Sequence, residues 1–186
     1  MRILGISGSV RTGSYNSAAL DVAEGLLPDG VQLDRFTGLA DLPVYSEELD
    51  VGGRELTVAR LRCALARVDG ILVATPEYNA SLPGGLKNAL DWASRPFPDN
   101  SLRNKPVAVI GASTGIFGAI WAQAETRKIL KAIGAHVLDV ELPIREAESR
   151  FRDKRLDPEI ENQLGELIGA LIDAIQAHRP SEASRG

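Results

Sequence analysis

Short apolar runs alternate with amphipathic segments along the whole chain. The runs read as strands that are buried on both faces of a sheet, and they cover residues 2–7, 31–36, 71–75, 106–110 and 136–141. The segments between them carry apolar residues at helical spacing, which predicts helices over 17–27, 54–67, 83–92, 117–133 and 158–177. Strands that alternate with helices favour an α/β fold of three layers, with a doubly wound, five-stranded parallel sheet in the middle.

Turn residues and caps mark the ends of these elements. Pro83 suits the first turn of a helix, because its missing N–H is no loss there, and Gly134 suits the position just past a helix end. We expect irregular chain at 37–51 and a solvated, charged loop at 146–155. The sequence has no repeat, linker or low-complexity block. Residues 1–179 are therefore interpreted as one domain, followed by a disordered tail at 180–186.

Three polar loops follow the first, third and fourth predicted strands. In open parallel sheets, ligands bind beyond the carboxyl ends of the strands, where the strand order reverses. The loops at 8–16, 76–82 and 111–118 meet this condition, and all three are rich in Gly, Ser, Thr and Asn. They are the candidate walls of a ligand site.

The first of these loops has the character of an anion site. Its sequence, GSVRTGSYNS at 8–17, joins a strand to the start of a helix. Unpaired N–H groups and the helix dipole favour negative charge at that point. Ser9, Ser14, Asn16 and Ser17 add donors, and Arg11 adds a guanidinium that fits phosphate. Serine and asparagine are also common helix caps, so capping alone is the competing interpretation.

Motif spacing narrows the choice of phosphate ligand. The loop has no Gly-Lys-Ser or Gly-Lys-Thr ending, so it lacks the lysine and hydroxyl with which a P-loop binds a triphosphate and its magnesium ion. It also lacks the three-glycine spacing of the dinucleotide fingerprint. A serine-rich loop with one arginine favours a monophosphate.

The second loop carries a more specific pattern. Residues 75–92, TPEYNASLPGGLKNALDW, resemble the signature of the NAD(P)H-dependent FMN reductase family. The first loop resembles the phosphate motif of that family, and GASTGIFG at 111–118 is similar to its flavin-side loop. The resemblance covers about residues 2–142. Two positions depart from it, because Ser17 and Trp121 stand where the family often has arginine.

The resemblance implies a flavodoxin-like fold, with strand order 2-1-3-4-5, that binds FMN without a covalent bond. It also implies homodimers or homotetramers with the flavin near the subunit interface. The residues expected to contact FMN are Ser9, Arg11, Ser14, Tyr15, Asn16 and Ser17 in the first loop, Pro76, Glu77, Tyr78 and Asn79 in the second, and Ser113 and Gly115 in the third.

The implied reaction is an oxidoreduction carried by the flavin. Hydride passes from NADPH or NADH to FMN, and then to a small acceptor such as a flavin, a quinone, an azo compound or chromate, which predicts ping-pong kinetics. No side chain is expected to act as a general acid or base, and no metal is expected. Main-chain N–H groups of 77–79 and of the third loop are the candidates for stabilising the reduced ring. The alternatives are a flavodoxin-like electron carrier without nicotinamide turnover, and an interaction module with a vestigial flavin site.

Composition and charge argue against other classes of protein. A net charge of −4 without a basic stripe disfavours nucleic-acid binding, and it is too modest for a typical acidic electron carrier. No apolar run approaches the roughly 20 residues of a membrane span, and the first residues do not resemble a signal peptide, so we expect a cytoplasmic protein. The single Cys63 is expected to be buried and inert, and His136 and His178 are expected to lie far apart.

Overall fold

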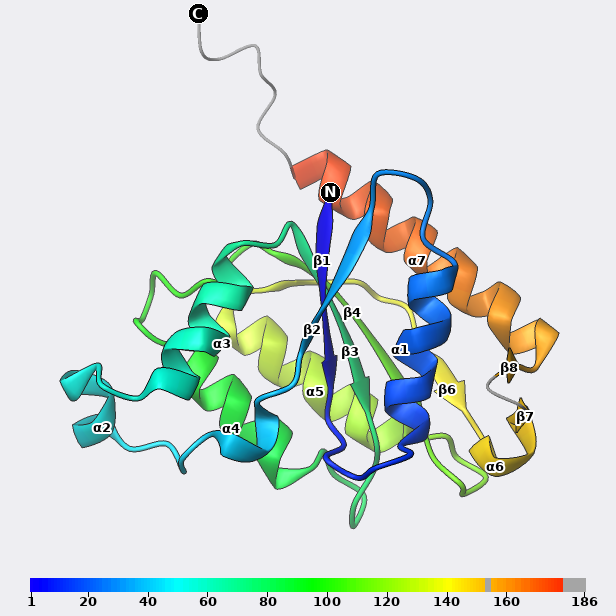
Figure 1. Cartoon of the computed structure of the whole chain (residues 1–186), viewed down its shortest axis with the longest axis horizontal. Helices are drawn as coiled ribbons and strands as arrows, with labels where there is room; N and C mark the ends of the chain where they lie inside the picture. The colour runs from blue at the N-terminus through cyan, green and yellow to red at the C-terminus, as the bar shows by residue number, and fades with distance from the viewer. Residues whose placement is uncertain (153–154, 179–186) are drawn as a thin grey trace, which may run out of the picture.

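A parallel sheet lies between two layers of helices in the computed structural model, which describes residues 1–152 and 155–178 (Figure 1). The sheet follows the order β2-β1-β3-β4-β5, and β6 also pairs with β4. All of these pairs are parallel. The strands are β1 (Arg2–Ser7), β2 (Gln32–Phe36), β3 (Gly70–Thr75), β4 (Pro106–Ala112), β5 (His136–Val137) and β6 (Leu142–Ile144). The predicted fold class and strand order are confirmed.

Helices cover both faces because side chains alternate between the faces along each strand. Leu4, Ile71 and Val107 pack with the helices α3 (Leu56–Ala66), α4 (Gly84–Ala93) and α5 (Ile120–Ile133). Ile3 and Leu72 point the other way, toward α1 (Tyr15–Gly25) and α7 (Pro158–His178). The predicted helices are confirmed with shifted ends.

Capping residues explain where α1 begins and where α5 ends. The α1 helix begins at Tyr15 rather than residue 17, because Ser14 caps it. The predicted cap at Gly134 is confirmed: its φ of 98° is left-handed, and its N–H donates to the carbonyl of Lys131.

The predicted fifth strand at 136–141 is wrong in its extent. β5 pairs with the amino end of β4 at Pro106 and Val107, whereas β6 pairs with the carboxyl end of β4. Between them the chain leaves the sheet, because Arg127 of α5 donates to the carbonyl of Val140 and forms an ion pair with Glu141. These contacts hold residues 140–141 against α5 instead of β4, so a continuous fifth strand does not form.

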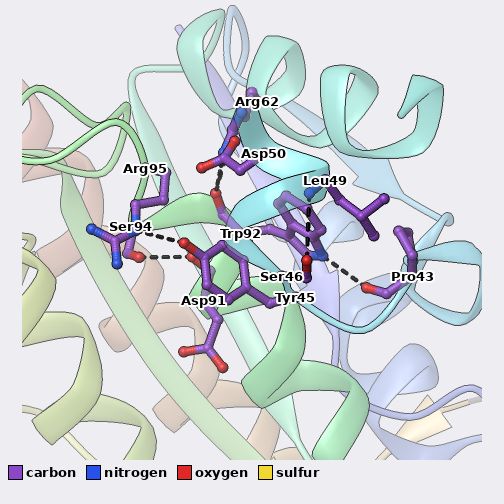
Figure 2. Close-up of polar contacts among 10 residues, drawn as sticks. All are labelled: Pro43, Tyr45, Ser46, Leu49, Asp50, Arg62, Asp91, Trp92, Ser94 and Arg95. Carbon is purple, nitrogen blue, oxygen red and sulfur yellow. Dashed lines mark hydrogen bonds and ion pairs between the residues drawn. The ribbon is translucent and has the colours of Figure 1, made fainter. Parts of the chain in front are cut away.

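The segment at 37–51, predicted to be irregular, contains two short helices. These are η1 (Leu39–Asp41) and α2 (Glu47–Gly52), and the side chain of Ser46 caps α2. The segment packs on α4 around the fully buried Trp92 (Figure 2). The indole N–H of Trp92 donates to the carbonyl of Pro43 at 2.8 Å, and the ring of Tyr45 meets the indole edge-on at 4.9 Å. Trp92 thus fixes the path of the chain that follows β2.

The charged segment at 146–155 is also more ordered than expected. It contains α6 (Ala147–Arg150) and β7 (Phe151–Arg152), which pairs antiparallel with β8 (Arg155–Leu156). Arg150 forms an ion pair with Asp157 at 3.2 Å. Residues 153–154 and the predicted tail at 180–186 lie outside the described residues.

Two further expectations are wrong. Cys63 is exposed on α3, although its neighbours Leu61 and Leu65 are buried. The rings of His136 and His178 lie 4.2 Å apart, because the end of the long helix α7 returns to the edge of the sheet where β5 begins. In the described part of the chain, no helix is both long enough and apolar enough to cross a membrane.

Candidate functional site

The three polar loops meet at the carboxyl edge of β1, β3 and β4 (Figure 1). They enclose a hollow of about 290 Å³. Most of the residues predicted to contact a ligand line it together: Ser9, Arg11, Ser14, Tyr15, Asn16, Pro76, Glu77, Tyr78 and Ser113, along with the unpredicted Ala112 and Thr114. The predicted Ser17, Asn79 and Gly115 are not among its lining residues.

The first loop lies close against the end of β3 and the start of the second loop. The N–H of Gly8 donates to the carbonyl of Ala74 at 2.7 Å. A Cβ at Gly8 would lie 3.0 Å from Leu86 Cδ2 and 3.2 Å from Pro76 Cδ, so a larger residue would push the loops apart. Glycine at this position therefore allows the first loop to lie directly against the start of the second.

Ser14 and Asn16 organise the start of α1. The Ser14 hydroxyl accepts a hydrogen bond from the N–H of Asn16, so the capping interpretation is correct for this side chain. The Asn16 amide is buried and bonds both ways to Ala112, donating to its carbonyl at 3.0 Å and accepting from its N–H at 2.9 Å. Asn16 therefore joins the first loop to the third, with its side chain already engaged.

Arg11 is the cationic side chain of this hollow, and few contacts hold it. Its guanidinium donates to the carbonyl of Gly13 at 3.4 Å and lies 5.8 Å from the centre of the Tyr15 ring. Tyr15 in turn stacks on Phe151 at 5.5 Å. A loosely bonded guanidinium beside a helix N-terminus provides positive charge for an anion.

The second loop turns back on itself at its tip. Tyr78 and Ser81 exchange main-chain hydrogen bonds, and Asn79 and Ala80 between them have φ values of 53° and 59°. Two consecutive residues of positive φ form a tight hairpin turn. The turn uses the N–H of Tyr78, which removes one of the predicted ring donors.

Two carboxylates fasten the second loop to α5. Glu77 Oε2 accepts from the N–H groups of Trp121 at 3.0 Å and Ala122 at 3.1 Å. In the opposite direction, Glu125 accepts from the Ser81 hydroxyl at 2.5 Å and from the N–H of Leu82 at 3.4 Å. Since the residue before α5 is Ala119, which has no capping side chain, Glu77 acts as the cap from a distance of 44 residues.

We expect Glu77→Ala to lower the free energy of unfolding by about 1–2 kcal/mol, because it removes a charged cap from the N-terminus of α5. Urea denaturation followed by circular dichroism measures the change. Glu24→Ala, at an exposed position of α1, is the matched control and should change stability by less than about 0.5 kcal/mol. Equal losses in the two variants would contradict the capping role.

The third loop is held by the chain that follows β5. The N–H of Ser113 donates to the carbonyl of Ile144, and the N–H groups of Glu146 and Ala147 donate back to the carbonyls of Gly115 and Ser113. No local feature of the sequence predicted these contacts, because residues 146–155 have only the character of a charged loop. Among the described residues no cluster of three His, Cys, Asp or Glu side chains could hold a metal ion.

Exposed aromatic side chains lie on the second loop, at the end of the third loop and in the first turn of α5. Tyr78 is about half exposed, and Phe117 packs against Trp121 with ring centres 4.8 Å apart. Trp121 is 45% exposed, unlike the buried Trp92. A hollow lined by polar residues together with the aromatic rings of Tyr15 and Tyr78 suits a ligand that has a charged end and a planar, less polar end.

Comparisons with known proteins agree on one family. The family model described as NADPH-dependent FMN reductase matches residues 1–149. The chain is 42% identical over 178 residues to an NAD(P)H-dependent FMN reductase of Pseudomonas aeruginosa, covering 95% of this chain and 94% of the relative. It is 32% identical over 169 residues to a quinone reductase of Escherichia coli K12, covering 90% and 85%.

A solved structure of a flavoenzyme also resembles this chain. The flavoenzyme NAD(P)H:(acceptor) oxidoreductase FerB from Paracoccus denitrificans superposes with a TM-score of 0.83 at 31% identity. The match covers 95% of this chain and 98% of that structure.

Proposed function

The chain belongs to the NADPH-dependent FMN reductase family, and from this premise we propose that the hollow between its three loops is the FMN site. The protein is an NAD(P)H-dependent oxidoreductase with FMN as its cofactor. The chemistry supplied by bound FMN is the transfer of two electrons from the nicotinamide to a second substrate.

The convergence of the three loops is the observation that carries this proposal. Phosphate donors come from one side of the hollow, through Ser9, Arg11 and the N-terminus of α1. Pro76, Tyr78 and Ser113 form the other side, where a ribityl chain and a ring would lie. The residues present therefore fit a phosphate at one end and a planar group at the other.

Ser14, Asn16 and Glu77 act through the main chain. Their side chains bond to the start of α1, to Ala112 and to the start of α5, so each positions a loop of the site. We assign no direct side-chain contact to FMN for them. Ser17, whose hydroxyl donates to Ser7 at 3.0 Å, is likewise a supporting residue of the first loop.

Free main-chain donors remain for the flavin ring. Within the described chain the N–H groups of Glu77, Asn79 and Thr114 make no hydrogen bond, whereas those of Tyr78, Ser113 and Gly115 are bonded. We propose that the N–H groups of Glu77 and Thr114, the two of these residues that line the hollow, face the part of the ring that gains negative charge on reduction. Donors fixed in advance are effective there, because they need no rearrangement during the reaction.

For the second substrate we propose a free flavin or a quinone, with azo compounds and chromate as further acceptors. Relatives named as FMN reductase and quinone reductase support the first two. We also propose that the protein forms homodimers or homotetramers in the cytoplasm. The exposed Ile116, Phe117 and Trp121 beside the hollow support an interface there.

Anaerobic mixing of the FMN-loaded protein with NADPH tests the function. The expected result is loss of the visible absorbance band of the oxidised flavin, followed by its return when FMN, benzoquinone, chromate or an azo dye is added, with ping-pong kinetics in the steady state. No bleaching would leave an electron carrier as the better interpretation. A protein that takes up no FMN would overturn the cofactor site itself.

A further inference from the structure

A second hollow, of about 410 Å³, lies on the other side of the first loop, at the ends of β1 and β2. It shares Ser9 and Arg11 with the proposed FMN site, so the two hollows are separated by little more than this loop. Its volume falls within the range of small-molecule sites. The proposed function gives this space no role.

The lining of this hollow is cationic. Arg11 and Arg35 both border it, and none of its described lining residues is acidic. The acidic groups nearby are Asp21, which forms an ion pair with Arg35, and the exposed Asp41, which follows the lining residue Ala40. Positive charge without a carboxylate in the lining favours an anionic ligand.

Arg35 is fixed in place but is not fully satisfied. It is paired in register with Gly5, and a Cβ at Gly5 would lie 3.2 Å from Arg35 Cδ, so the side chain lies across the glycine. Nη2 donates to the carbonyl of Ser17 at 3.0 Å and to Asp21. Nη1 is buried and has no hydrogen-bond partner within the described chain. Buried guanidinium nitrogens are normally bonded, and a rotation of the Arg35 side chain into the hollow that it lines would give Nη1 a phosphate oxygen as its acceptor.

The remaining walls indicate what else the ligand carries. Phe36 and Leu39 give the hollow an apolar side, and Ser7, Ser17 and Thr37 give it hydroxyl groups. A nucleoside phosphate matches this set, since its base suits the apolar side, its ribose the hydroxyls and its phosphate Arg35, the arginine of the hollow that the FMN phosphate does not use.

We propose that the second hollow binds the adenosine-phosphate half of a dinucleotide. The inference rests on the proposed function, which places a flavin phosphate on the other face of the same loop and requires NAD(P)H to approach it. Adenosine phosphate could reach the hollow as part of NAD(P)H or as part of FAD. Both sources present the same chemistry to Arg35.

Calorimetric titration of the FMN-loaded protein with 5′-AMP and with adenosine 2′,5′-bisphosphate tests the site directly. We expect both to bind to the wild type, and Arg35→Gln to weaken binding at least tenfold. Arg2→Gln is the matched control, because Arg2 also forms an ion pair between β1 and β2, with Asp34 at 2.7 Å, but at the opposite end of the strands. Thr37→Trp, which fills the hollow from an exposed position, should block binding even if Arg35→Gln does not fold.

Two further measurements distinguish the sources. If the ligand is the adenylate end of NAD(P)H, Arg35→Gln raises the KM for NADPH but not for reduced nicotinamide mononucleotide, which has no adenosine. If it is FAD, the apoprotein binds FAD more tightly than FMN, and Arg35→Gln removes that excess.

The titration needs no turnover, so the two proposals can fail separately. Normal NADPH oxidation with no AMP binding, or with equal AMP binding in wild type and Arg35→Gln, would overturn the second site alone. Arg35-dependent AMP binding by a protein that NADPH does not reduce would overturn the reductase function alone.

Discussion

Replacing Arg11 with alanine is expected to weaken FMN binding by about 1.5–3 kcal/mol, the range for charge-assisted hydrogen bonds. This corresponds to a roughly 10- to 150-fold rise in Kd. Arg11 lines the three-loop hollow, and its guanidinium has only the long contact to the carbonyl of Gly13. The side chain can therefore turn to a phosphate without breaking a strong bond. Quenching of FMN fluorescence during titration with apoprotein measures the Kd.

Two control variants separate this effect from general loss of charge or of folding. Arg54→Ala removes an exposed arginine before α3 and should leave the Kd of FMN unchanged. Arg11→Lys keeps the charge but not the planar fork, so its Kd should fall between those of the wild type and Arg11→Ala. Because Arg11 is exposed, stability should change by less than about 0.5 kcal/mol. A normal Kd in the alanine variant would remove Arg11 from the site.

The strands of the sheet could be predicted because burial on both faces leaves a local mark. β1 has the predicted bounds, and β3 differs by the single residue Gly70. The division of the last strand into β5 and β6 could not be predicted. It depends on Arg127, which lies on α5 and bonds to Val140 and Glu141, 13 and 14 residues further along the chain. Ser46, whose side chain caps α2, is a local sign of that helix. The mixed composition of residues 37–51 nevertheless led to the prediction of irregular chain.

The candidate site likewise has features that could be predicted from the sequence and features that could not. Its polar loops could be predicted from residue types and from the rule that ligands bind beyond the carboxyl ends of strands. The contacts that position those loops join distant residues, such as Asn16 with Ala112 and Glu77 with Trp121. Arg35 was not predicted either. Its place beside the second hollow depends on its pairing with Gly5, and that register exists only once the sheet has formed.

Replacing Trp92 with alanine is expected to lower the free energy of unfolding by about 3–5 kcal/mol, the usual cost of deleting a buried large aromatic side chain. Trp92 is completely buried, and Tyr45 packs against its edge (Figure 2). The lost hydrogen bond contributes less, because Asn88 also donates to the carbonyl of Pro43, at 2.8 Å. The main cost is the cavity. Urea denaturation followed by circular dichroism gives the free energy.

Trp121→Ala is the matched control for this prediction, because the same side chain is deleted at an exposed position beside the hollow. It should cost less than about 1 kcal/mol. Trp92→Phe keeps most of the packing and should fall between the two. A loss in Trp92→Ala no larger than that in Trp121→Ala would mean that the segment at 37–51 does not depend on the indole. Thr37, Leu39 and Ala40, which belong to this segment, line the second hollow. If the segment depends on the indole, Trp92→Ala should also weaken AMP binding in the protein that remains folded.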